Sequence, residues 1–167
     1  SWFKGFNPSI SITQYILYGF NQLKELKAVE FSDDILSMQK NAVFYIDTEA
    51  VRRFEAMKKY NKDWKNIKSI SVPDLEYLYV RSGYTGYPLD KEGEEMTDFY
   101  LSVIGKNWTQ YGLYERSLIV MLMSRKGKTG IVKDILDSFR EHAVRSDEMG
   151  MYWANNRAQV FMSQSAV

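Results

Sequence analysis

The sequence contains no cysteine, only three prolines and a single histidine. The absence of cysteine excludes thiol nucleophiles, disulfide bonds and cysteine-ligated metal sites from this chain. A zinc site would need carboxylates to complete the coordination by His142, and a Ser-His-Asp triad would depend on the same ring. We therefore predict no metal site and no cofactor, and we interpret His142 as a structural residue near the end of a helix.

An excess of charge of one sign is also missing, and so are long apolar runs. The 22 lysines and arginines nearly balance the 21 aspartates and glutamates. This balance provides no long-range field that would attract a polyanion, so we expect no nucleic-acid partner. The longest apolar run, residues 118–123, is far shorter than the roughly 20 residues of a membrane-spanning helix. We therefore expect no direct membrane insertion by this piece, and a single domain over residues 1–167.

Apolar residues recur every three or four positions over six stretches of the chain, which predicts six helices. The stretches are approximately residues 12–26, 35–57, 72–83, 96–104, 113–122 and 131–139. We expect Ser32 or Asp33, Ser71 and Thr129 to cap the second, third and sixth helices. The fifth stretch is apolar on most of its circumference, so we expect it to be central. The predicted fold class is all-α, built from helical hairpins.

Segments between the helices give weaker signals. Residues 84–93 contain glycines and a proline and form the clearest loop, long enough to be mobile or functional. Residues 146–156 show no period, and the tail 158–166 is compatible with a helix or an extended piece. The turn Gly127-Lys128-Thr129 has Leu122 where a phosphate-binding loop requires glycine, so we expect an ordinary interhelical turn.

Aromatic residues make up 15% of the chain, and several lie near predicted helix ends and loops. For any one of them, a packed ring with a solvated hydroxyl is the simpler interpretation. As a group around the clearest loop they are the best candidates for an interaction face. The members of this predicted face are Tyr79, Arg81, Tyr84, Tyr87, Tyr152 and Trp153.

Pairs of carboxylates are the other candidates for chemistry, because sugar-cleaving enzymes place two acids roughly 5 to 9.5 Å apart. At predicted helix starts and on polar faces, solvated charge and helix capping explain such residues without catalysis. We therefore predict no catalytic residue. The candidates are Asp74, Glu76, Glu94, Glu95, Asp98 and Glu115.

Four blocks of sequence, in their order along the chain, resemble one family. They are Ser1-Trp2-Phe3-Lys4-Gly5 with Thr13-Gln14-Tyr15, then Tyr77-Leu78-Tyr79-Val80-Arg81-Ser82, then Glu141-His142-Ala143, and Gly150-Met151-Tyr152-Trp153. Together they resemble the thioester-domain region of bacterial alpha-2-macroglobulin-like proteins. Because the chain opens on an aromatic pair, we expect it to be part of a larger protein and the domain to be truncated.

This resemblance implies that the helical hairpins form part of an α/α toroid. It implies a non-catalytic domain of an endopeptidase inhibitor that traps proteases after they cleave a bait segment. The implied partners are proteases, engaged through the full-length parent, and other domains of that parent. The implied location is the bacterial cell envelope, in the periplasm or anchored to the outer membrane. The Cys-Gly-Glu-Gln thioester motif of the family is expected upstream of Trp2.

The resemblance carries over structural residues only, namely Trp2, Phe3, Gly5, Gln14, Tyr15, Tyr79, Arg81, Gly150, Tyr152 and Trp153. Two other hypotheses remain open. A carbohydrate-active enzyme with an α/α toroid, either a glycosidase or a lyase, would have two buried acids about a bond's width apart. A general helical scaffold for binding proteins would have a large concave aromatic face.

Overall fold

The computed structural model describes residues 8–153. Within this range the chain forms six α-helices, two short 3-10 helices and one small sheet. The elements are α1 (Ile10–Glu25), α2 (Asp33–Tyr60), η1 (Trp64–Asn66), α3 (Val72–Arg81), α4 (Lys91–Asn107), η2 (Trp108–Gln110), α5 (Leu113–Arg125), α6 (Thr129–Glu141), β1 (Val144–Ser146) and β2 (Gly150–Tyr152). The predicted all-α class is confirmed. Of the residues carried over by resemblance, Trp2, Phe3 and Gly5 lie outside the described range.

Three of the helices have a polar N-cap residue, whose side chain accepts a hydrogen bond from a backbone amide of the first turn. Ser9 caps α1, Ser71 caps α3 and Asp90 caps α4. The predicted cap at Ser71 is confirmed, with Asp74 N donating to its Oγ over 3.3 Å. Ser32 occupies the cap position of α2 without a side-chain hydrogen bond. The predicted cap at Thr129 is wrong, because Thr129 is already the first helical residue.

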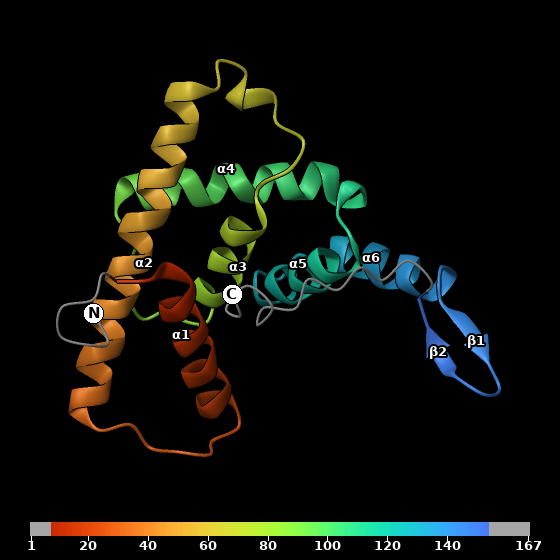
Figure 1. The fold of residues 1–167 in the computed structure, drawn as a ribbon, viewed down its shortest axis with the longest axis horizontal. Helices are drawn as coiled ribbons and strands as arrows, with labels where there is room; N and C mark the ends of the chain where they lie inside the picture. The colour runs from red at the N-terminus through yellow and green to blue at the C-terminus, as the bar shows by residue number, and fades with distance from the viewer. Residues whose placement is uncertain (1–7, 154–167) are drawn as a thin grey trace.

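The helix at the centre of the fold is α3, which packs against α1, α2 and α5 (Figure 1). Seven of its ten residues are buried: Asp74, Leu75, Tyr77, Leu78, Tyr79, Val80 and Arg81. The prediction that the fifth stretch, residues 113–122, forms the central helix is therefore wrong. Helix α5 has one side against α3 and another against α6, and buries four residues. Its apolar circumference reflects these two neighbours.

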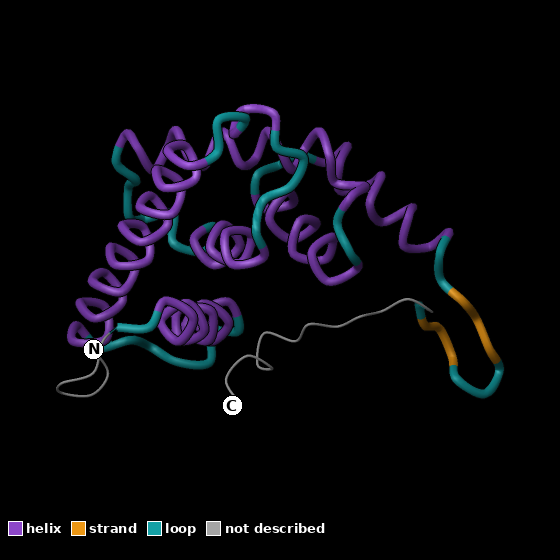
Figure 2. The backbone as a smooth tube through the Cα atoms, turned by 45° about the horizontal axis from the view of Figure 1, so that its top comes forward, coloured by secondary structure: helices purple, strands orange, loops and turns teal. Residues whose placement is uncertain are grey.

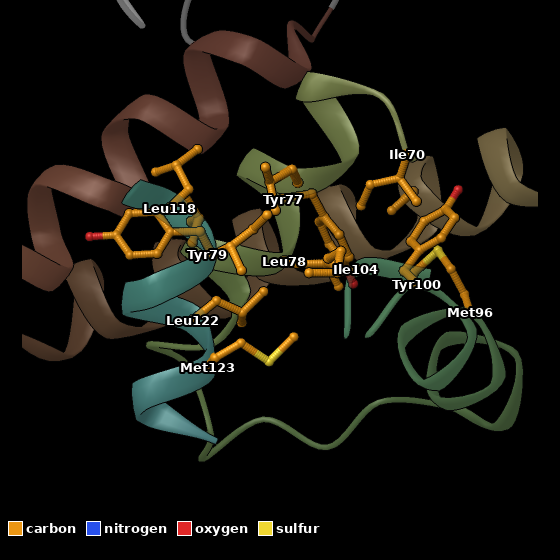
Figure 3. Packing of buried hydrophobic residues seen from close by; sticks show 14 of the residues in the cluster. Ile70, Tyr77, Leu78, Tyr79, Met96, Tyr100, Ile104, Leu118, Leu122 and Met123 are labelled. Carbon is orange, nitrogen blue, oxygen red and sulfur yellow. The ribbon is translucent and has the colours of Figure 1, made fainter. Parts of the chain in front are cut away.

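Two further packings complete the described fold. Helices α1 and α2 pack against one another, and so do α5 and α6, while α4 lies across α2 (Figures 1 and 2). Side chains of α3, α4 and α5 meet in the core, where Tyr77 and Ile104 lie between Leu118 on one side and Tyr100 on the other (Figure 3). An aromatic cluster extends this core where α2, η1 and α4 meet. Its members are Phe54, Trp64, Phe99 and Tyr100.

The only sheet among the described residues is a short hairpin that was not predicted. Strands β1 and β2 pair antiparallel, with Arg145 opposite Met151. Gly150 has φ +71°, a left-handed conformation that glycine adopts without a steric penalty. The hairpin projects beyond the end of α6 (Figure 1). It was missed because three-residue strands are too short to display a period of two.

Candidate functional site

Three residues of the predicted interaction face are inside the protein. Tyr79, Arg81 and Tyr84 are only 4%, 7% and 7% exposed. Tyr79 and Arg81 are buried because α3 is surrounded by other helices, and Tyr84, in the segment after α3, is buried against α1. The prediction that these residues belong to an exposed face is wrong. Tyr87 is half-buried at the edge of a cleft.

The other two members, Tyr152 and Trp153, belong to the hairpin region and lie away from α3 (Figures 1 and 2). The Trp153 indole N–H donates to the backbone oxygen of Phe139 over 2.9 Å. The two rings meet edge to face, with centroids 6.2 Å apart. Trp153 thus fastens the hairpin to α6. The six residues form no single face.

Arg81 lies at the centre of a network of hydrogen bonds inside the protein. Its Nε donates to both carboxylate oxygens of Asp47, at 2.9 and 3.1 Å, and the Tyr77 hydroxyl donates to the same carboxylate over 2.8 Å. The two terminal nitrogens of Arg81 donate to the backbone oxygens of Tyr84 and Tyr87. Burial raises the pKa of Asp47, while Tyr77 and Arg81 oppose that change. One guanidinium therefore joins α2, α3 and the following loop.

The loop after α3 is also fastened to α1. The Tyr84 hydroxyl donates to the backbone oxygen of Leu17 over 2.5 Å. Gly83 lies so close to α1 that a Cβ at this position would be 2.5 Å from the Asn21 amide oxygen. The segment that the sequence presented as potentially mobile is thus held at both Tyr84 and Tyr87.

A cleft of about 420 Å³ lies beside this loop, between α3, α4 and α5. Helix α4 contributes Glu94, Thr97 and Asp98 to its wall, and Lys126 reaches it from the end of α5. Glu94 and Asp98 are four residues apart, a spacing that brings their Cβ atoms within about 5–6 Å on one helix face. The Thr97 hydroxyl is buried without a hydrogen-bond partner. This is the described cleft that comes closest to a binding site with paired acids.

The other candidate carboxylates have structural partners or lie at a helix start. Asp74 is buried, contrary to the sequence interpretation, and forms an ion pair with Arg53 at 2.8 Å. Glu76 accepts a hydrogen bond from the Tyr114 hydroxyl, and burial raises the pKa of Glu76. Glu95 lies 3.4 Å from Lys58. Glu115 lies in the first turn of α5.

His142 ends α6, and its Nδ1 is 2.8 Å from the backbone oxygen of Ser138, as the structural interpretation predicts. Across residues 8–153, histidine and carboxylate side chains form no group of three or more that is able to hold a metal ion. None of the helices in this range has the length and apolar character needed to cross a membrane.

The described part of this protein is a helical fold with a small β-hairpin after α6. No family model matches the chain, and no curated protein or solved structure has significant similarity to it.

Proposed function

We propose that this chain is a non-catalytic helical domain of a bacterial alpha-2-macroglobulin-like protease inhibitor, in which it forms part of an α/α toroid. The observation that carries the proposal is the position of the resembling blocks in the fold. Residues 77–82 form the second half of the central helix α3 and its C-cap, and Trp153 fastens the hairpin to α6. The resembling residues thus hold the framework together, which suits a domain that acts by binding and rearrangement.

An exposed apolar stripe on α1 supports the toroid part of the proposal. Ile12 and Leu23 share one face of α1, and Leu26 at the C-cap continues it; the three side chains are 51%, 38% and 73% exposed. Phe44 on α2 is 73% exposed. Apolar surface of this kind marks contact sites when it is continuous. In a toroid, helices of adjoining hairpins would cover these side chains.

In the proposed role the domain engages no substrate of its own. Its partners are the other domains of the parent chain and, after bait cleavage, the attacking protease. The proposed location is the bacterial cell envelope, since the resemblance is to envelope inhibitors. No nucleic acid takes part in this role.

The test uses the full-length parent protein and a panel of endopeptidases. After incubation, a trapped protease should lose activity toward a large protein substrate and keep activity toward a small chromogenic peptide. Enclosure produces this difference because only the small substrate reaches the active site. Gel filtration should show the protease comigrating with the cleaved parent. Equal activity toward both substrates, with no comigration, would contradict the proposal.

The carbohydrate-active alternative is favoured by one observation, the pair Glu94 and Asp98 on the wall of the cleft. Both side chains are exposed, whereas a general acid in a glycosidase depends on an environment that raises its pKa. We therefore expect no release of reducing sugar from a panel of polysaccharides. Turnover that disappears in Glu94→Gln or Asp98→Asn but persists in Glu92→Gln, an exposed residue of the same helix, would establish the enzyme instead.

A further inference from the structure

A second hollow, of about 440 Å³, lies between η1, the segment that follows it and the second half of α4. Figure 1 shows the two parts of the chain that line it, the yellow segment that contains η1 and the helix α4. Three exposed lysines line it, Lys65, Lys68 and Lys106, together with the aromatic rings of Trp64 and Phe99. The hollow therefore combines positive charge with an apolar wall.

The charges of these lysines are not neutralised within the described part of the chain. None of the ion pairs found between residues 8 and 153 includes Lys65, Lys68 or Lys106. Neighbouring Lys58, in contrast, lies 2.8 Å from Glu55 and 3.4 Å from Glu95.

Local negative charge reduces this surplus without removing it. The C-terminal end of α4 supplies about half a negative charge through the helix dipole, which Lys106 in its last turn partly offsets. Asp63 is the nearest acid in sequence, and its carboxylate accepts a hydrogen bond from Asn66 over 2.6 Å. Three lysines against these two sources leave a net positive site.

The surroundings of Trp64 favour a peptide over a nucleic acid. Ammonium groups of Lys58 and Lys65 lie over its ring, each 5.5 Å from the centroid. Phe54 and Phe99 contact the same ring edge to face. A base stacking on Trp64 would have to displace a lysine, which removes the main source of sequence-tolerant nucleic-acid affinity. All cations that line the hollow are lysines, so the forked geometry with which arginine binds phosphate is absent.

We propose that this hollow binds an acidic peptide segment of another protein, one that carries an apolar side chain between carboxylates. The carboxylates pair with Lys65, Lys68 and Lys106, and the apolar side chain lies against Phe99 and the edge of Trp64. This proposal does not depend on the proposed inhibitor function.

The test titrates the whole chain with a capped peptide in which a phenylalanine stands between glutamates, and follows binding by calorimetry. A triple variant with Lys65→Gln, Lys68→Gln and Lys106→Gln should bind about tenfold more weakly, since three exposed ion pairs are lost. The matched control is Lys24→Gln, Lys40→Gln and Lys91→Gln, which removes the same charge from exposed sites elsewhere. It should bind like the unmodified chain.

Four further titrations separate this site from other sources of affinity. A peptide with glutamine in place of glutamate should not bind. Added salt should weaken the binding of the acidic peptide, because it screens exposed charges. Equal losses in the two triple variants would overturn the proposal in favour of general electrostatics. If inorganic phosphate or a short oligonucleotide displaces the peptide at a concentration lower than that of the peptide, the proposal would be overturned in favour of a phosphate or nucleic-acid site. Absence of any binding would overturn it as well.

Discussion

Replacing Arg81 with methionine should lower the free energy of unfolding by about 3–5 kcal/mol, because it leaves the Asp47 carboxylate, whose side chain is only 18% exposed, without a cation. Methionine retains much of the side-chain volume, so the loss reports charge and hydrogen bonding more than packing. Backbone oxygens of Tyr84 and Tyr87 also lose their donors. Urea denaturation followed by far-UV circular dichroism measures the change.

The matched control is Arg52→Met. Arg52 forms an ion pair with Glu49 at 2.8 Å, but its side chain is 68% exposed. Exposed pairs contribute little because water and salt screen them. The control should therefore leave the free energy of unfolding nearly unchanged. Similar losses in both variants would mean that burial of the Arg81 network has no energetic importance.

A double-mutant cycle extends this prediction to the partner of Arg81. Burial raises the pKa of Asp47 despite the opposing effects of Tyr77 and Arg81, so attraction within the pair does not fully offset desolvation. Removing both charges in Asp47→Leu with Arg81→Met should then cost less than the sum of the two single losses. Additive losses would show that the two charges do not interact.

Helix positions were predictable because one-sided burial leaves a regular record in the sequence. The predicted stretch 131–139, for example, lies inside α6, whose apolar residues face α5 along one side. The position of α3 was also predicted, but its burial was not. This helix is buried on nearly every side, and its buried residues include Asp74 and Arg81. A polar residue in a sequence is read as exposed unless its partner is known. The partners, Arg53 and Asp47, are 21 and 34 positions away.

The candidate site was harder to predict for the same reason. Tyr79, Arg81 and Tyr84 occur near a loop, where aromatic and charged residues often mark a binding surface. Only the packing of α1 and α5 over α3 decides that these residues point inward. The lysine hollow was missed because Lys65 and Lys106 are distant in sequence, and each alone is an ordinary surface charge.

Raising the pH above about 10 should unfold this protein cooperatively, because many of its tyrosines are held neutral in the folded state. Burial raises the pKa of Tyr77, Tyr84, Tyr100 and Tyr114. An unfolded tyrosine ionises near pH 10, so below that value both states are neutral and the full stability is present. Above it the unfolded state releases protons that the folded state retains, so stability falls as pH rises.

The size of the effect follows from the number of groups. Each such tyrosine contributes a slope of up to about 1.4 kcal/mol per pH unit, and partial solvent access reduces the share of the less buried ones. A combined slope of about 3 kcal/mol per pH unit above pH 10 would remove about 6 kcal/mol by pH 12, which exhausts a stability at the low end of the ordinary ~5–15 kcal/mol. The share of tyrosinate absorbance that comes from the buried tyrosines should therefore appear together with the loss of the far-UV circular dichroism signal.

Two phenylalanine substitutions separate buried tyrosines from exposed ones. Tyr100 is 1% exposed and Tyr60 is 78% exposed. Tyr100→Phe removes one group that ionises only on unfolding, so the dependence of stability on pH should become shallower by up to about 1.4 kcal/mol per unit. Tyr60→Phe should leave the slope unchanged. If the tyrosinate absorbance of all twelve tyrosines develops while the helical signal persists, the buried hydroxyls ionise within the folded protein, and the alkaline transition has another cause.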